Sequence, residues 1–136
     1  MELDHVVVWV DDPLKSIDFY VNVVGLAPVR AEEFRAGEAP FPSVRVSERS
    51  IIDLTPRQDA EAVNAMTRAT GTAGYPVNHI CIAMSKQEYE ALIERLELHG
   101  ADMSYRTVTY GARGNAPRAF YFHDPDNNVI EARYYD

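Results

Sequence analysis

The stretch His5–Val10, which reads HVVVWV, is matched later in the chain by His79–Met84, which reads HICIAM. Each begins with a histidine and continues as a short apolar run, followed by turn-forming residues, a helical segment and a glycine. The glycines, Gly25 and Gly100, come 20 and 21 residues after their histidines. Internal repetition of this kind indicates two copies of one structural unit, so this repeat decides the fold class.

The first copy predicts a strand followed by a capped helix. The apolar run is rich in β-branched residues and bounded by turn formers, which is typical of a buried strand. We expect Asp11 or Asp12 to cap the helix and Pro13 to take its first position. The apolar stripe predicted for this helix consists of Leu14, Ile17, Val21 and Val24.

The second copy predicts the same pair of elements. Ser85 and Glu88 have the spacing of a capping box at the start of the helix. Gly25 and Gly100 stand where a left-handed residue commonly ends a helix. The apolar stripe predicted for the second helix consists of Tyr89, Leu92, Ile93 and Leu96.

Three further strands are predicted after each helix, so the order β-α-β-β-β occurs twice in an α+β fold. A single helix over a small sheet gives each module too little core to be stable alone, and we therefore predict one domain over residues 1–136. Its parts are module 1 (1–56), a connection (57–77) and module 2 (78–136), and the connection has a weakly helical portion at 60–69 and a flexible one at 71–74. The later strands are expected at 28–34, 44–46 and 50–54, and at 102–109, 118–122 and 128–134.

The composition excludes several classes of function. The 136 residues carry a net charge of −8 and no run of Lys or Arg, so neither nucleic acid nor an anionic membrane is an expected partner. The longest apolar stretch, Val6–Val10, is far too short to span a bilayer. The acidic N-terminus is unlike a secretory signal, and the single Cys81 fits a reducing compartment, so we expect a cytoplasmic protein.

Strand alternation predicts that the two histidines occupy equivalent places. His5, Val7 and Trp9 share one face of the first strand, and His79 shares a face with Cys81 in its own strand. The aliphatic faces should lie under the helices, which leaves both imidazoles on the opposite face. If a pseudo-twofold axis relates the modules, both histidines converge on it.

A third polar group comes from the last strand, where Glu131 stands between apolar neighbours. Its counterpart in the repeat is Asp53: the separations are 48 residues from His5 to Asp53 and 52 from His79 to Glu131. A lone strand histidine is more often a packed residue than a ligand. Two histidines in equivalent positions and a mid-strand glutamate favour a catalytic site for Fe(II), Mn(II), Zn(II) or Ni(II).

The chain resembles the vicinal oxygen chelate superfamily, which includes glyoxalase I, bleomycin and fosfomycin resistance proteins and extradiol dioxygenases. The resemblance covers the whole chain and rests on residues 3–8, 12–26 and 120–131. It implies two βαβββ modules forming a cup-shaped mixed sheet around a metal. It also implies metal ligands at His5, His79 and Glu131, a homodimer, and a substrate-bonding hydroxyl at Tyr121, for which a packed aromatic ring is the alternative.

Two residues depart from the family's pattern. Asn127 replaces the usual turn glycine, and asparagine tolerates the left-handed conformation that this turn needs. Asp53 is shorter than the carboxylate that glyoxalase-type members use as a fourth ligand. We therefore favour three ligands and a substrate-side role for Asp53, with capping of the following turn as the alternative.

Other residues carry weaker signals. His123, at a strand end, is a candidate acid or base, although a solvated histidine is the commoner case. The segment 110–115 resembles the mobile loop over the substrate mouth of relatives. Tyr110 and Arg113 are therefore candidate contacts to the substrate, with Arg118 as another cation able to meet an anion. Trp9 is a further candidate, as an aromatic residue suited to an aromatic compound.

These features favour a metalloenzyme whose small-molecule substrate chelates the metal through adjacent oxygens. Two histidines and a glutamate match the facial triad of non-haem Fe(II), so Fe(II) and cleavage of a catechol-type ring are preferred. A fosfomycin-type transferase, or a glyoxalase- or epimerase-type enzyme, remains an alternative within the superfamily. A metal-free protein that binds an antibiotic or aromatic compound is the alternative from another class.

Overall fold

The computed structural model describes residues 3–67, 77, 79–111 and 113–135, without the side chains of residues 66, 67, 110 and 114. The chain divides into two compact units, Met1–Pro76 and Val77–Asp136, whose boundary falls at the end of the predicted connection. The predicted flexible portion at 71–74 lies outside the described residues.

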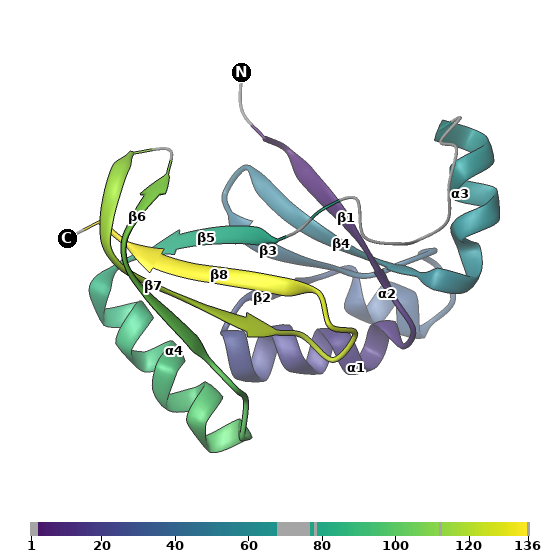
Figure 1. Ribbon diagram of the computed structural model, residues 1–136. Helices are drawn as coiled ribbons and strands as arrows, with labels where there is room; N and C mark the ends of the chain where they lie inside the picture. Colours follow the sequence, from purple (N-terminus) through teal and green to yellow (C-terminus); the bar gives the residue numbers. More distant parts are fainter. Residues whose placement is uncertain (1–2, 68–76, 78, 112, 136) are drawn as a thin grey trace. The chain divides into compact units, whose positions relative to one another are not determined.

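The first unit holds a four-stranded sheet with the order β1-β4-β3-β2. Strand β1 pairs with β4 in parallel, and the other two pairings are antiparallel. A helical segment crosses one face of this sheet (Figure 1). The elements are β1 (His5–Val10), α1 (Pro13–Asp18), the π-helix η1 (Phe19–Val24), β2 (Ala27–Val29), α2 (Ala31–Arg35), β3 (Ser43–Ser47), β4 (Ser50–Pro56), the 3-10 helix η2 (Arg57–Asp59) and α3 (Ala60–Thr67).

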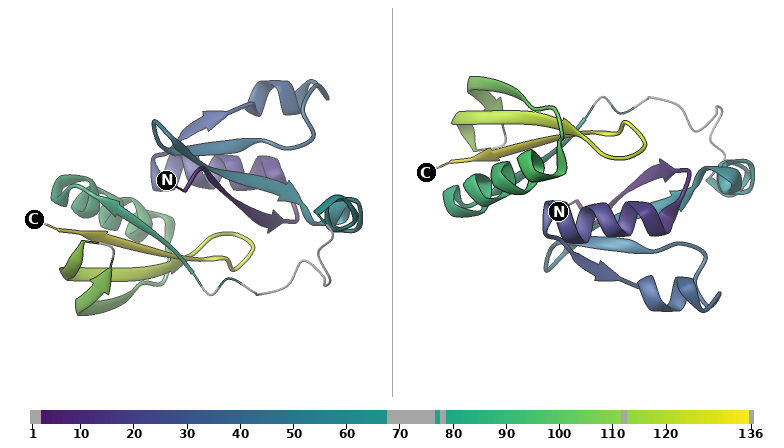
Figure 2. Two further views of the ribbon diagram at one scale, coloured as in Figure 1. Left: turned by 90° about the horizontal axis from the view of Figure 1, so that it is seen from above. Right: turned by 90° about the horizontal axis from the view of Figure 1, so that it is seen from below.

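The second unit repeats this topology with the order β5-β8-β7-β6, and β5 pairs with β8 in parallel. Helix α4 lies along one face of its sheet, as the two views in Figure 2 show. The predicted double βαβββ order is therefore confirmed. The elements are β5 (Ile80–Met84), α4 (Lys86–His99), β6 (Ser104–Gly111), β7 (Gly114–His123) and β8 (Val129–Tyr134).

The strand predicted over residues 28–34 is wrong in its second half. Strand β2 ends at Val29, and helix α2 follows from Ala31. The change of direction occurs at Arg30, whose left-handed backbone (φ 59°) cannot continue a strand. The next residues, AEE, are good helix formers, and two glutamates in the first turn complement the helix dipole.

The first helix differs from its predicted stripe at Leu14, and its second half is a π-helix. The N–H groups of Gly25 and Leu26 both donate to the Tyr20 carbonyl, at 3.0 and 2.9 Å, so the last turn is wide. Leu14 from the predicted stripe lies in the α-helical part before this turn and is 39% exposed. The predicted cap at Asp12 is confirmed: its side chain accepts from two backbone N–H groups. The buried residues are Pro13, Ser16, Ile17, Phe19, Tyr20 and Val24.

Helix α4 packs on its sheet through aromatic side chains. The ring of Tyr89 lies 5.0 Å from that of Phe120 and 4.9 Å from that of Tyr134, measured between centroids. The predicted capping box of Ser85 and Glu88 is present at its start. The helix ends at Gly100 (φ 77°), as predicted.

The turn between β7 and β8 orders the start of the last strand. Buried Asp124 accepts hydrogen bonds from the backbone N–H groups of Asp126 and Asn128, at 2.8 and 2.9 Å. Asn127 adopts φ 63°, which confirms that asparagine serves in place of glycine here. The turn therefore fixes where β8, with Glu131, begins.

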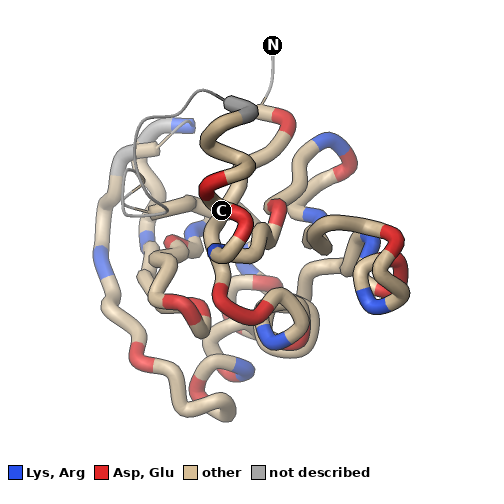
Figure 3. The backbone as a smooth tube through the Cα atoms, turned by 90° about the vertical axis from the view of Figure 1, so that its right-hand side faces the viewer, with Lys and Arg blue, Asp and Glu red and all other residues tan. Residues whose placement is uncertain are grey.

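Charged residues of both signs are interspersed along the backbone (Figure 3). Within the described parts of the chain, none of the helices has the length and apolar character needed to cross a membrane.

Candidate functional site

Strand register places Asp53 and Glu131 in equivalent positions of the two sheets. Asp53 on β4 lies opposite Val7 on β1 and Ser43 on β3. Glu131 on β8 lies opposite Cys81 on β5 and Tyr121 on β7. Paired residues in a sheet point to the same face, so each carboxylate shares a face with the residue two positions after its module's histidine.

In the second unit, His79 and Glu131 are brought together. His79 Nε2 lies 3.1 Å from Glu131 Oε2, and the Glu131 side chain is 1% exposed. The ring of Tyr121 meets the imidazole edge-on, with centroids 5.4 Å apart and planes at 89°. These three residues come from β7, β8 and the residue preceding β5, and their side chains form one cluster on the sheet.

Arg133 occupies the other oxygen of the carboxylate. Its Nε donates to Glu131 Oε1 at 3.1 Å, and its Nη2 donates to the same oxygen. Its Nη1 lies 3.4 Å from both the Thr109 carbonyl and the Tyr135 hydroxyl. The Arg133 side chain is 5% exposed, so these contacts hold a buried cation beside a buried anion.

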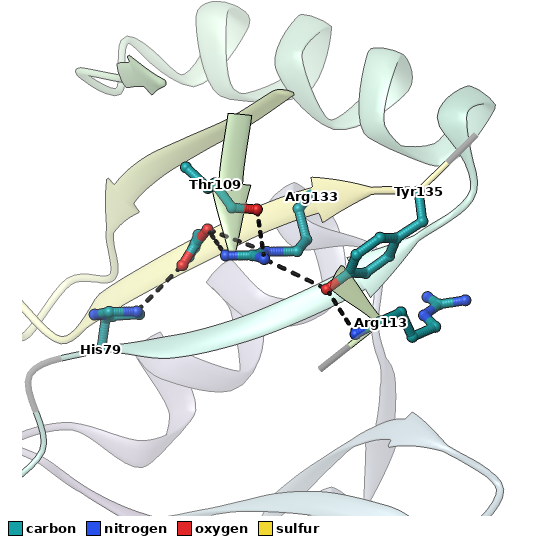
Figure 4. Close-up of polar contacts among 6 residues, drawn as sticks. His79, Thr109, Arg113, Arg133 and Tyr135 are labelled. Atoms are coloured by element: carbon teal, nitrogen blue, oxygen red, sulfur yellow. Dashed lines mark hydrogen bonds and ion pairs between the residues drawn. The ribbon is translucent and has the colours of Figure 1, made fainter. Parts of the chain in front are cut away.

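The β6–β7 hairpin is connected to the same cluster by contacts between Arg113 and Tyr135, the residue that follows β8. The Arg113 guanidinium stacks 4.4 Å from the Tyr135 ring centroid, and its backbone N–H points to the Tyr135 hydroxyl at 3.5 Å. Figure 4 shows the resulting series of contacts, which runs from His79 past Arg133 to Tyr135 and Arg113. The segment 110–115, which resembles the mobile loop of relatives, is thus connected to the Glu131 carboxylate through Tyr135 and Arg133.

The Cys81 thiol and the Tyr121 hydroxyl, both near Glu131, have raised pKa values. Burial, followed by the nearby Glu131 charge, raises the pKa of the Cys81 thiol to about 11. The same two causes, in the same order, raise the pKa of the Tyr121 hydroxyl above its usual 10. At neutral pH, Tyr121 therefore presents an O–H donor beside the carboxylate, and Cys81 is a thiol rather than a nucleophilic thiolate.

In the first unit, His5 is half-exposed and contacts Asp4, with 2.7 Å between Nδ1 and Oδ1. That hydrogen bond is the main reason why the pKa of His5 is raised, and the charge of Asp53 adds to it. His5 precedes Val7 by two residues on β1, so it lies on the same sheet face as Asp53.

Asp53 is buried and already holds two donors. The Ser43 hydroxyl donates to Asp53 Oδ1 at 2.6 Å. Arg30 Nη2 donates to the same oxygen at 3.3 Å and to the Ser43 hydroxyl at 2.6 Å. Asp53 therefore anchors an arginine, which agrees with a substrate-side or structural role better than with metal ligation.

The pair His79–Glu131 fits a metal ion as well as a hydrogen bond. Two donors bound at about 2.1 Å and at a right angle lie about 3.0 Å apart, close to the observed separation. Within the described part of the chain, however, no three His, Cys, Asp or Glu side chains form a group that could hold a metal. His5 belongs to the first unit and the other two to the second, so the three-ligand set stays a prediction.

The remaining predicted site residues are placed as follows. Trp9 lies opposite Thr55 and on the face of His5. His123 is exposed at the end of β7, opposite Val129 and on the face of Tyr121. The structure does not describe the side chain of Tyr110.

Sequence reasoning missed four residues. Arg133 and Tyr135 could have been found, because they alternate with Glu131 on one face of the last strand. Ser43 could have been found only through strand register. Nothing in the local sequence marked Arg30, because its role depends on the unpredicted turn between β2 and α2.

Comparison with known proteins identifies the family. The chain belongs to the Glyoxalase/Bleomycin resistance protein/Dioxygenase superfamily, whose sequence profile matches residues 2–132. A search of curated proteins found no match.

Several solved structures share the fold at low sequence identity. An integron cassette protein from the mobile metagenome of V. cholerae has a TM-score of 0.68 and 23% identity, over 100% of this chain and 96% of that one. A lactoylglutathione lyase from Agrobacterium tumefaciens has a TM-score of 0.68 and 19% identity, over 98% and 92%. A glyoxalase/dioxygenase from Nostoc punctiforme has a TM-score of 0.68 and 17% identity, over 99% and 91%.

Proposed function

We propose that the protein is a divalent-metal-dependent enzyme whose small substrate binds the metal through two adjacent oxygens. The observation that carries the proposal is the 3.1 Å approach of His79 Nε2 to Glu131 Oε2 on a sheet of this superfamily. His5 holds the equivalent place in the other repeat and is proposed as the third ligand. We favour Fe(II), because two histidines and one carboxylate suit that metal, with Mn(II), Zn(II) or Ni(II) as alternatives.

The favoured reaction is dioxygenase-like cleavage of a catechol-type ring. Three protein ligands would leave open positions, at which a bound metal would polarise the substrate oxygens and bring dioxygen beside them. We also propose a homodimer, as the family resemblance implies, and a cytoplasmic location, which the single Cys81 favours.

The residues around the carboxylate have separate proposed roles. The Tyr121 hydroxyl donates a hydrogen bond to a substrate oxygen, because its ring lies edge-on to the His79 imidazole and its residue lies opposite Glu131. Arg133 holds Glu131 Oε1 and so leaves Oε2 as the single oxygen facing His79. His123, exposed on the same face, is the proposed acid or base that exchanges protons with solvent. Trp9, Tyr110 and Arg113 are the proposed further contacts to the substrate.

A specific observation also supports a second function, that of a metal-free binding protein. Each sheet buries a carboxylate that is paired with an arginine: Asp53 with Arg30, and Glu131 with Arg133. Such pairs need no metal to balance the buried charge. The superfamily includes bleomycin resistance proteins, so binding of a small aromatic compound is the competing proposal.

Metal content separates the two proposals. The full chain is purified anaerobically without a histidine tag, and bound metal is measured by mass spectrometry in the wild type, His5→Ala and Glu131→Ala. His99→Gln, at the end of α4, is the matched control. One equivalent of metal that is lost in both site variants and retained in the control is the expected result. No metal in the wild type after reconstitution with each ion would leave the binding protein as the function.

The reaction is tested separately with the iron-loaded protein. We expect oxygen consumption with catechol-type substrates and the appearance of ring-cleaved products by mass spectrometry. Tyr121→Phe should lower turnover and keep the metal, since its hydroxyl is assigned to the substrate. Metal retention with no oxygen consumption over a broad catechol panel would exclude the dioxygenase and direct the search to glyoxalase- or transferase-type substrates.

A further inference from the structure

Arg30 is an unusual residue in the first unit. It follows β2 in a left-handed conformation (φ 59°) that non-glycine residues seldom adopt. Such backbone persists only where the surrounding structure holds it, and it is concentrated at functional sites. Here the side chain is held: Nη2 contacts Ser43 and Asp53, and the guanidinium lies 4.8 Å from the Phe41 ring centroid.

The rest of this guanidinium is not used by the protein. Among residues that the structure describes, neither Nε nor Nη1 of Arg30 has a hydrogen-bond partner, and Nε is buried. The side chain is 38% exposed, and because Nη2 faces two buried groups, Nη1 is the accessible edge. Arg133 makes the contrast clear, since it is 5% exposed and all three of its nitrogens are bonded.

The Nη1 edge of Arg30 lies beside the sheet face that carries His5 and Trp9. Arg30 binds Asp53, which lies opposite Val7 and therefore on the same face of the sheet as His5 and Trp9. An arginine that is fixed at one edge by a buried carboxylate loses little conformational entropy when its other edge meets a ligand. The arrangement is that of a preorganised cation, not of a solvated surface arginine.

We propose that Arg30 is an anion-binding residue that recognises a carboxylate group on a small apolar or aromatic ligand. A monoanion is favoured over phosphate because the Asp53 carboxylate, 3.3 Å from Arg30 Nη2, would repel a second negative charge. Phe41 beneath the guanidinium and Trp9 on the same sheet face suit an apolar body. The inference deepens the proposed function, on which it rests for the statement that the ligand is the small-molecule substrate.

The test is an NMR titration of the full chain with benzoate, with benzamide as the neutral analogue and inorganic phosphate as the dianion. It is performed on the protein as purified and again after removal of metal with a chelator. We expect benzoate to shift the Arg30 Nε–H resonance and to bind at least about tenfold more tightly than benzamide, as a charged hydrogen bond predicts.

The variants are chosen so that misfolding does not imitate loss of binding. Arg30→Gln leaves Asp53 buried and unpaired, so Arg30→Gln/Asp53→Asn is made as well, to keep a neutral pair. Both should lose about tenfold in benzoate affinity. Arg45→Gln, which removes an exposed arginine bound to the Ser47 and Glu48 carbonyls, should bind as the wild type does.

Three results would overturn the proposal: unchanged benzoate affinity in a folded double variant, equal affinity for benzamide, or tighter binding of phosphate. Failure of the proposed function would be recognised by a different measurement, because the wild-type protein would then contain no metal. Loss of the carboxylate site with full metal content would contradict only the role of Arg30.

Discussion

Arg133 donates from both Nε and Nη2 to one oxygen of Glu131, two residues earlier on the same strand. Both side chains are almost completely buried. The pairing fixes the rotamer of the glutamate, because one oxygen is held on the arginine side and the other faces His79. A carboxylate that would otherwise be costly to bury is thus paired with a cation and oriented before any ligand binds.

Removing this arginine should be strongly destabilising. Arg133→Met keeps much of the side-chain volume but leaves the Glu131 charge, which is 1% exposed, without its cation. We expect the free energy of unfolding, measured by urea denaturation, to fall by about 3–5 kcal/mol, as for other broken buried pairs.

The matched control is a double-mutant cycle. Glu131→Gln removes the buried charge, so adding it to Arg133→Met should restore part of the lost stability. Strictly additive losses would mean that the two side chains do not interact as the structure describes.

The tip of the β6–β7 hairpin should influence the same pair through Gly111. A Cβ atom at this position would overlap Arg133 Nη1 and the Tyr135 hydroxyl more closely than real Cβ atoms come. Both atoms are the ends of flexible side chains, so we expect Gly111→Ala to fold, with Arg133 displaced from Glu131. Overpacking of this kind typically costs about 1–3 kcal/mol, measurable by urea denaturation.

Arg133→Met provides the control background for Gly111→Ala. With the guanidinium gone, the overlap with Arg133 disappears and that with the Tyr135 hydroxyl remains, so the added methyl group should cost less than in the wild type. An equal cost in both backgrounds would show that the alanine acts through Tyr135 or the hairpin backbone rather than through Arg133.

The repeated topology was predictable because it depends on local signals. Two apolar runs headed by histidines, the caps at Asp12 and Ser85, and two helix-ending glycines each report on their own neighbourhood. Strand alternation then placed Glu131 on a definite face. These signals are short-range and agree with one another, which is why the sequence could reveal them.

The features that the sequence did not reveal depend on contacts between distant segments. Arg30 reaches Asp53 across 23 positions, and only the left-handed turn at Arg30 makes that contact possible. The π-helical second half of the first helix has no signal in the local sequence. Neither a propensity nor a periodicity encodes such tertiary choices.

Tyr89 carries a buried polar group that the fold does not satisfy. Its side chain is almost fully buried between α4 and the sheet, and its hydroxyl has no hydrogen-bond partner among the residues described. Burial raises the pKa of this hydroxyl to about 12. Tyr89→Phe removes the unsatisfied group and keeps the ring, so we expect equal or higher stability, by up to about 1 kcal/mol.

Tyr89→Leu separates the ring from the hydroxyl. It also lacks the hydroxyl, but it loses the ring contacts to Phe120 and Tyr134 and should therefore destabilise the protein. Thermal denaturation of the two variants side by side is the measurement. A clear loss of stability in Tyr89→Phe would reveal a partner for the hydroxyl.

The capping box of α4 should give a pH-dependent contribution to stability. Glu88 Oε2 accepts from the Ser85 hydroxyl at 2.7 Å and from the Ser85 backbone N–H at 2.8 Å, and these bonds lower the pKa of Glu88 below 4.5. A carboxyl whose pKa is lower in the folded state stabilises that state above its unfolded pKa. The contribution is lost as the pH falls through the folded pKa.

We therefore expect Glu88→Gln to cost up to about 1 kcal/mol at pH 7, and progressively less as the pH falls below 4.5. Urea denaturation at several pH values measures the difference from the wild type. Glu94→Gln, an exposed position in the middle of the same helix, is the control and should show little dependence on pH. A cost for Glu88→Gln that stays constant down to pH 3 would mean that the charged carboxylate does not contribute to the cap.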